Sequence, residues 1–219
     1  MARSAAAALP ATYILYLVTD AGLSRGRSHL SIVEAAVRGG VTIVQYREKN
    51  ASTRRMIEEA NGLCRLCRAA GISFIVNDRL DVALAVDADG VHVGQDDMPA
   101  SRARRLLGRK KILGVSAGSV EEALEAVDDG ADYIGASPVF STPTKPDAPP
   151  PLGIEGLRRI AEAVRIPVVA IGGINAENAA AMREAGAAGI AVVSAIVAAE
   201  DVEEAARALR ATVENVRAR

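Results

Sequence analysis

Three polar side chains end one short apolar stretch of the chain and stand at every second position. Residues 44–50 read VQYREKN, which places Gln45, Arg47 and Lys49 two residues apart. In an extended chain these three side chains point to the same side. An amide and two cations aimed at one place predict the binding of an anionic ligand. Surface ion pairs, for example with Glu48, are the alternative explanation.

Carboxylates end the next two apolar stretches. FIVNDR carries Asn77 and Asp78, and HVGQDD carries Asp96 and Asp97. Mg²⁺ commonly takes one or two carboxylates together with phosphate oxygens of a substrate. Asp78 with one of the later aspartates therefore predicts a metal site beside the cations. Acid–base catalysis by a carboxylate pair and helix capping are the two alternatives.

Hydroxyls, glycines and one further lysine come from later segments. The proline-rich stretch FSTPTKPDAPPPLG offers Thr142, Thr144 and Lys145, and it is long enough to form a lid. Threonine hydroxyls donate hydrogen bonds to phosphate oxygens, and lysine supplies charge. The pair Gly172–Gly173 in AIGGI, followed later by AVVSAI, allows backbone N–H groups to approach an anion. A stiff surface loop and a plain tight turn are the alternatives.

Eight short apolar stretches, spaced fairly evenly, are the elements that must position these residues. They begin at Tyr13, Val41, Ser73, Gly90, Lys111, Ala131, Ile166 and Ala188. Five helical patterns accompany them, including SVEEALEAVDDG, in which Ser119 and Glu122 have the spacing of a capping box. Strand followed by helix eight times predicts an α/β fold of the (β/α)₈ TIM-barrel type. An open, doubly wound sheet is the alternative, but no G-x-G-x-x-G follows the first strand.

The predicted barrel is a single domain over residues 12–219, and residues 1–11 are expected to form a flexible N-terminal tail. In such barrels the active site lies at the carboxyl ends of the strands. If Val41 and Ile43 fill the barrel interior, the polar residues that follow them on the same side reach its mouth. The polar residues after the other strands should gather at the same place.

Three residues with reactive side chains are expected to serve packing instead of chemistry. His92 lies between valines inside a predicted strand, which is typical of a packed or capping group. Cys64 and Cys67 lie within a helical pattern and are flanked by leucines. That position favours ordinary packing over a redox motif, and no further ligands at matching spacing suggest zinc.

Amino-acid composition limits the kinds of molecule that the protein is expected to bind. Of the 219 residues, 26 are basic and 27 acidic, which gives a formal net charge of −1 without a block of one sign. That balance argues against a general nucleic-acid or membrane surface. No apolar run approaches the roughly 20 residues that span a bilayer, so the chain is expected to be cytoplasmic. Small-molecule substrates are the expected partners, and a homo-oligomer is compatible with the sequence.

The motifs, taken in order along nearly the whole chain, resemble those of the thiamine phosphate synthase family. The matching stretches are YLVTD, VQYREK, FIVNDR, GVHVGQDD, GVSA, STPTK, IGGI and VVSAI. The resemblance implies a transferase of thiamine biosynthesis that joins a pyrimidine methyl diphosphate to a thiazole ethyl phosphate. It also implies a dissociative reaction, in which Mg²⁺ assists the departure of pyrophosphate before the thiazole nitrogen captures the pyrimidine cation.

The same resemblance assigns roles to individual residues. The pyrimidine diphosphate would be held by Gln45, Arg47, Lys49, Asn77, Ser116 and Lys145. The catalytic residues among these would be Arg47, Lys49, Ser116 and Lys145. The thiazole phosphate would be bound by Thr142, Thr144, Gly173, Val193 and Ser194. Mg²⁺ would be bound by Asp78 and Asp97, with Asp96 as a neighbour.

Some positions depart from the family pattern, and two related functions compete with the synthase. Tyr46 replaces a usual leucine, and strand parity directs it toward the helices; Ser141 replaces a usual proline in the lid. A related thiazole tautomerase family shares the barrel but typically lacks the Mg²⁺ aspartates, both of which are present here. A non-catalytic, ligand-sensing barrel would be expected to lose the leaving-group residues. The sequence therefore favours the synthase.

Overall fold

Eight parallel strands close into a barrel in the computed structural model, which describes residues 13–142, 144, 149–214 and 216. The strands are β1 (Leu15–Val18), β2 (Ile43–Tyr46), β3 (Ser73–Asn77), β4 (Gly90–Val93), β5 (Ile112–Ala117), β6 (Tyr133–Ala136), β7 (Val168–Ile171) and β8 (Gly189–Val192). Each strand pairs with the next, and β8 pairs with β1. The predicted TIM barrel is therefore confirmed, and the open sheet is excluded.

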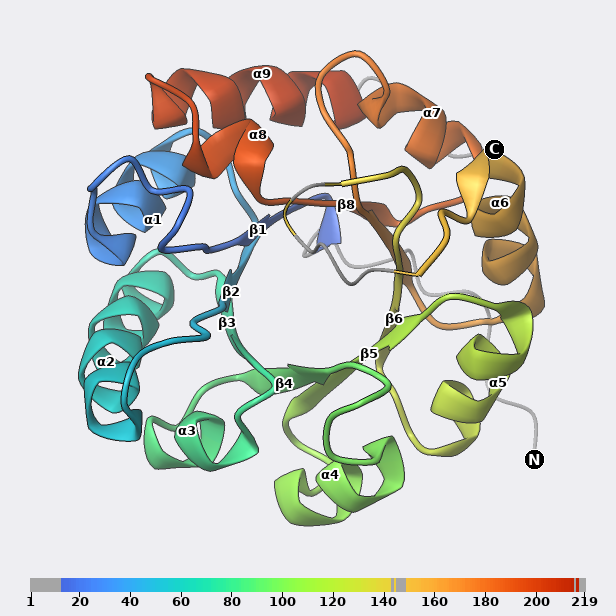
Figure 1. Cartoon of the computed structure of the whole chain (residues 1–219), viewed down its shortest axis with the longest axis horizontal. Helices are drawn as coiled ribbons and strands as arrows, with labels where there is room; N and C mark the ends of the chain where they lie inside the picture. The colour runs from blue at the N-terminus through green and yellow to red at the C-terminus, as the bar shows by residue number, and fades with distance from the viewer. Residues whose placement is uncertain (1–12, 143, 145–148, 215, 217–219) are drawn as a thin grey trace.

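Helices surround the ring of strands on its outside, as Figure 1 shows. They are α1 (His29–Arg38), α2 (Thr53–Ala69), α3 (Leu80–Ala85), α4 (Ala100–Leu107), α5 (Val120–Asp128), α6 (Gly153–Ala163), α7 (Ala179–Glu184), α8 (Ser194–Val197) and α9 (Val202–Glu214). All five predicted helical patterns are present. No helix within the described part of the chain is long and apolar enough to cross a membrane. The expected tail at residues 1–11 lies outside the described residues.

Side chains along each strand alternate between two apolar layers. In β1, Leu15 and Leu17 belong to the core between strands and helices. The intervening Tyr16, and Val18 after it, belong to the cluster inside the barrel. This period of two is what an extended chain requires. Inward-facing side chains therefore build the floor of any site at the barrel mouth.

The same alternation in β2 confirms one prediction and corrects another. Ile43 lies inside the barrel, whereas Tyr46 lies in the outer core and donates a hydrogen bond to Glu59 of α2 at 2.9 Å. The predicted outward orientation of Tyr46 is therefore correct. The expectation that Val41 fills the barrel interior is wrong, because Val41 packs in the outer core. It precedes β2, and its N–H bonds to Ala36 in the turn after α1, so strand parity does not extend to it.

The two cysteines belong to α2 and their side chains are buried, as predicted. Cys64 and Cys67 are buried and are not joined by a disulfide. Burial raises the pKa of the Cys67 thiol to about 12, so this group stays protonated at neutral pH. A protonated, buried thiol is a poor nucleophile and serves packing.

Candidate active site

A cavity of about 330 Å³ opens at the carboxyl ends of the strands. Every predicted site residue that the structure describes lines it: Gln45, Arg47, Lys49, Asn77, Asp78, Asp97, Ser116, Thr142, Thr144, Gly173, Val193 and Ser194. Lys145 lies outside the described residues. Residues far apart in the sequence thus share one space at the end of the barrel where enzymes of this architecture bind substrates.

The Arg47 guanidinium is held where β1 and β2 end side by side. Its Nη1 donates to Asp20 Oδ2 at 2.5 Å, and the two side chains are only 20% and 16% exposed. The Arg47 backbone N–H donates to Thr19 Oγ1 at 3.0 Å. Asp20 also accepts the Leu23 N–H at 3.1 Å. Asp20, whose role the sequence alone left open, is therefore a positioning residue for Arg47.

Lys49 and the two predicted metal-binding aspartates form one charged cluster. Lys49 Nζ donates to Asp78 Oδ2 at 2.5 Å. Burial, together with a hydrogen bond and negative charge from Asp78, raises the pKa of Asp97. Both cations form ion pairs among the described residues, as the alternative explanation expected, but the partners are Asp20 and Asp78 at the cavity and not Glu48.

Neither aspartate caps a helix. The residues before α3 and α4 are Arg79 and Pro99, and neither helix start has a side-chain cap. Asp97 instead accepts the Gly94 N–H at 2.7 Å within its own turn. Asp78 has a φ of 60°, a left-handed conformation that non-glycine residues seldom adopt and that often occurs at functional sites. The capping alternative is therefore wrong for both residues.

Asp78 and Asp97 fit a hard divalent cation. Burial, followed by a hydrogen bond and negative charge from Asp78, raises the pKa of Asp97, and a bound cation would offset the cost of keeping both carboxylates charged. Mg²⁺ prefers carboxylate oxygens and leaves its remaining positions to water and phosphate oxygens. Asp96 also lines the cavity but is exposed, and its place as a neighbour of the metal ligands stays a prediction.

Four hydrogen bonds run in series across the cavity floor. Gln45 Nε2 donates to Tyr16 Oη at 2.9 Å, and the Tyr16 and Tyr133 hydroxyls lie 2.8 Å apart. His92 Nδ1 lies 2.8 Å from Tyr133 Oη, and His92 Nε2 lies 2.9 Å from Ser116 Oγ. Burial lowers the pKa of His92 to about 4, so its ring is neutral at pH 7. This hydrogen-bonded floor connects Gln45 to Ser116, the two predicted contacts of the pyrimidine.

Three members of the hydrogen-bonded floor are not predicted from the sequence as site residues. His92 is packed, as expected, yet it also lines the cavity. Tyr16 and Tyr133 face the barrel interior from β1 and β6. A phenol directed into a barrel needs a hydrogen-bond partner there. Strand parity applied to the tyrosines was therefore the signal available in the sequence.

The opposite wall is made by the segment after β6, which packs on the glycine pair after β7. The Phe140 N–H donates to the Gly172 carbonyl oxygen at 3.0 Å. Gly173 has a φ of 64°, and a Cβ atom added to it would lie 2.8 Å from Phe140 Cβ. Both the left-handed backbone and the close approach require glycine. The contact brings Thr142 and Thr144 to the cavity beside Gly173.

Comparisons from sequence and from structure point to one family. The model of the thiamine monophosphate synthase family matches residues 15–196. Similar curated proteins include the thiamine-phosphate synthase of Chloroflexus aurantiacus, which is 68% identical over 91% of this chain and 92% of that protein. The thiamine-phosphate synthase of Moorella thermoacetica is 53% identical over 93% of this chain and 97% of that protein.

Solved structures agree with this result. Thiamine phosphate pyrophosphorylase from Pyrococcus furiosus is 49% identical, with a TM-score of 0.87 over 94% of this chain and 97% of that one. A 3-hexulose-6-phosphate synthase, 20% identical with a TM-score of 0.66, shares the fold alone.

Proposed function

This chain belongs to the thiamine monophosphate synthase family and is a thiamine-phosphate synthase, a transferase of thiamine biosynthesis, and we propose that it joins hydroxymethylpyrimidine diphosphate to hydroxyethylthiazole phosphate in the strand-end cavity. The bond between the pyrimidine methylene carbon and the diphosphate oxygen breaks, and its electron pair leaves with pyrophosphate. The thiazole nitrogen donates its lone pair to that carbon, which forms the new C–N bond and a thiazolium ring. The products are thiamine phosphate and pyrophosphate.

One observation supports this proposal above others: a single cavity has two walls that each suit a phosphorylated substrate. The wall with Arg47, Lys49 and Asp78 suits a diphosphate with its metal ion. The wall with Thr142 and Gly173 offers hydroxyl and backbone donors to a phosphate. Two substrates held this way bring their rings together between the walls, which removes much of the entropic cost of the encounter.

The first wall supports the departure of pyrophosphate. Arg47 and Lys49 place positive charge where negative charge develops on the leaving group. Mg²⁺ held by Asp78 and Asp97 supplies further charge to the leaving group when it is bound. Lys145 remains a predicted contributor from the lid. Because bond breaking can precede bond making with this support, we propose a dissociative mechanism without a protein nucleophile.

The hydrogen-bonded floor gives Ser116 a defined role. The amide nitrogen of Gln45 can only donate, so the Tyr16 oxygen accepts from it; in the proton order that we propose, Tyr16 donates its own proton onward to Tyr133. Tyr133 in turn donates to Nδ1 of the neutral His92, which leaves the His92 proton on Nε2, facing Ser116. The Ser116 hydroxyl therefore accepts from His92 and directs its own proton into the cavity. There it can donate to the pyrimidine substrate.

A reconstituted assay tests the proposed function. Purified protein is mixed with both substrates and Mg²⁺, thiamine phosphate is followed, and EDTA is the control. We expect metal-dependent product. Product that forms equally in EDTA would contradict the metal assignment. Absence of product from folded protein would contradict the function, and isomerisation of the carboxylated thiazole phosphate would then identify the tautomerase.

The location and assembly of the enzyme remain predictions. We expect a cytoplasmic enzyme with small-molecule substrates and no nucleic-acid or membrane partner, and its free buried cysteines fit a reducing compartment. Fractionation of the source cells checks the location. A homo-oligomer is compatible with the sequence, and light scattering on the purified protein measures its mass.

A further inference from the structure

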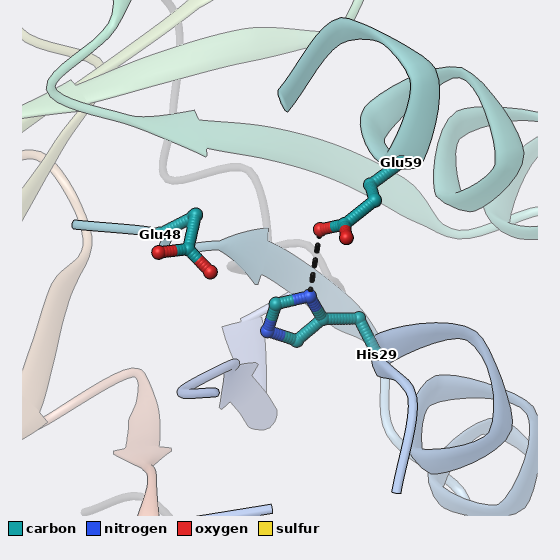
Figure 2. Close-up of side chains that lie close together, drawn as sticks. All are labelled: His29, Glu48 and Glu59. Carbon is teal, nitrogen blue, oxygen red and sulfur yellow. Dashed lines mark hydrogen bonds and ion pairs between the residues drawn. The ribbon is translucent and has the colours of Figure 1, made fainter. Parts of the chain in front are cut away.

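A second polar cluster, made of His29, Glu48 and Glu59, lies outside the cavity (Figure 2). His29 begins α1, Glu59 belongs to α2, and Glu48 follows β2. One ring nitrogen and one carboxylate oxygen from each glutamate lie within 4.8 Å of one another. Arg47 and Lys49 line the cavity, but Glu48 between them does not. The cluster is therefore separate from the proposed Mg²⁺ site.

Glu59 determines which nitrogen of His29 carries the proton. Although burial opposes it, hydrogen bonds from Arg55, Tyr46 and His29 lower the pKa of Glu59, so it is a carboxylate at neutral pH. Its Oε2 lies 3.2 Å from His29 Nδ1 and 2.9 Å from the Tyr46 hydroxyl. A carboxylate only accepts hydrogen bonds, so Nδ1 carries the proton. The nitrogen with the lone pair in neutral His29 is therefore Nε2.

His29 Nε2 has no hydrogen-bond partner among the described residues, although the side chain is only 8% exposed. Buried polar atoms are usually paired with protein groups, ordered water or a bound ligand, so this nitrogen is available to a ligand. In Figure 2 this nitrogen lies on the side of the ring that faces Glu48, away from the dashed bond to Glu59. Glu48 uses Oε1 to accept the N–H groups of Asn50 and Ala51, at 2.7 and 3.2 Å. Figure 2 shows one of the two Glu48 carboxylate oxygens directed toward the imidazole.

We propose that His29 Nε2 and the Glu48 carboxylate bind a divalent transition-metal ion of the Zn²⁺ type, with Glu59 orienting the imidazole through Nδ1–H. Imidazole nitrogen and carboxylate oxygen are ordinary ligands of such ions. A carboxylate that holds the other ring nitrogen is the usual arrangement behind a metal-bound histidine. The bound ion would tie the first turn of α1 to the segment after β2, in which Glu48 lies between Arg47 and Lys49.

Nitrogen NMR of the histidines tests the proposal site by site, since the chain has only two of them. When Zn²⁺ is added to untagged, ¹⁵N-labelled protein, we expect the His29 Nε2 signal to move from the range of an unprotonated nitrogen to that of a metal-bound one. Saturation is expected at an equimolar ratio. The His92 signals should not move, because both of its nitrogens are hydrogen-bonded.

Variants separate the new site from the cavity. Glu48→Gln keeps an acceptor for the backbone N–H groups but removes the charged ligand. Glu59→Gln removes the carboxylate that orients the His29 imidazole and should weaken Zn²⁺ binding by roughly 10- to 100-fold. A double variant with Asp78→Asn and Asp97→Asn should respond to Zn²⁺ as the wild type does. Thermal unfolding without metal checks that each variant folds. A His29 Nε2 signal that stays in place in excess Zn²⁺, or an unchanged response in Glu48→Gln, overturns the proposal.

Discussion

At the scale of the single residue, the backbone conformation and the carboxylate contacts of Asp78 are both unusual. Its backbone adopts a φ of 60°, and its carboxylate accepts Lys49 Nζ at 2.5 Å while raising the pKa of Asp97. A left-handed backbone that places one carboxylate beside another lowers the stability of the fold. Such an arrangement is expected where a cation is to be bound. Asp78 is therefore the residue on which the metal assignment is most sharply tested.

Asp78→Asn should lower turnover by roughly 100-fold or more, because it would remove one charge from the proposed Mg²⁺ site. Asparagine tolerates the left-handed backbone, so the fold should be kept. Steady-state turnover at saturating substrates and Mg²⁺ is the measurement. Asp96→Asn, an exposed neighbour on the same cavity, is the matched control and should turn over like the wild type. Wild-type turnover in Asp78→Asn would remove the metal assignment.

His92 makes folding stability depend on pH. Burial lowers its pKa in the folded protein to about 4, against about 6.5 in the unfolded chain, and the charge of Asp97 only partly offsets this. Between these values the unfolded chain binds more protons. The free energy of unfolding should therefore fall as the pH is lowered from about 6.5 to about 4, by at most about 3 kcal/mol.

Denaturant titrations at several pH values measure this dependence. The variant His92→Gln lacks the titrating ring and should have a shallower slope than the wild type between these pH values. Other titrating groups, including Asp97, are common to both proteins. Equal slopes in the two proteins would show that His92 does not titrate as the buried environment requires.

Tyr133→Phe should lower kcat/KM for the pyrimidine substrate roughly tenfold. It removes the hydrogen bonds that the Tyr133 hydroxyl makes with Tyr16 Oη and His92 Nδ1, and so breaks the proton order that ends at Ser116. Initial rates with each substrate varied in turn give the two kcat/KM values. Tyr13→Phe is the control, since Tyr13 packs against the Tyr133 ring at 5.0 Å between ring centroids but does not line the cavity. Equal losses in both variants would mean that the hydroxyl of Tyr133 only supports packing.

At the scale of the elements, strands are easier to recognise in this sequence than helices. Strands of a parallel barrel are buried on both faces, so all eight read as short apolar stretches. Helices α1, α2 and α5 begin with serine caps. In α5, Ser119 accepts the Glu122 N–H at 3.1 Å, and the Glu122 carboxylate accepts the Gly118 N–H at 2.7 Å. Helix α3, with six residues, and α8, with four, are too short for a helical period to appear.

Site residues at strand ends were predictable because the strands themselves are recognisable in the sequence. Side chains that contact each other across the barrel were not predicted. Arg47 and Asp78 directly follow the apolar stretches that form β2 and β3. Recognising those strands in the sequence is therefore enough to place both residues at the barrel mouth. Tyr16 and Tyr133 meet across the barrel although they stand 117 positions apart in the chain. Asp20 gained a role only when its distance to Arg47 was known. Strand parity can place each tyrosine inside the barrel, but a single sequence carries no direct signal of which residue it meets there.

The contact between the β6 and β7 segments gives a prediction at this scale. Gly173→Ala should raise KM for the thiazole phosphate several-fold, because a Cβ atom would lie 2.8 Å from Phe140 Cβ and displace the segment that carries Thr142. Gly71→Ala is the matched control: Gly71 has a similar φ of 68°, but nothing lies within 4 Å of its added Cβ. Both variants should lose about 1–2 kcal/mol of stability from the left-handed backbone.

KM for each substrate and the free energy of unfolding are measured for both variants. Only Gly173→Ala should change KM for the thiazole phosphate. An unchanged KM in Gly173→Ala would show that the glycine pair does not position the second wall.

At the scale of the whole molecule, barrel closure places the two walls around one space. Pairing of β8 with β1 completes the ring, so the ends of β2 and β3 and the ends of β7 and β8 open into the same cavity. The cationic wall and the hydroxyl wall thus come from different halves of the chain and meet only because the barrel closes. The central claim is that a diphosphate and a phosphate are bound at these two walls, with the metal at the first.

The measurement that tests this claim most directly is a crystal structure of the protein with thiamine phosphate and pyrophosphate, in which Mn²⁺ replaces Mg²⁺. Pyrophosphate is expected beside Arg47 and Lys49, and the thiamine phosphate group is expected between Thr142 and Gly173. An anomalous Mn²⁺ peak is expected between Asp78 and the pyrophosphate. A metal peak away from Asp78, or pyrophosphate at the Gly173 wall, would contradict the account.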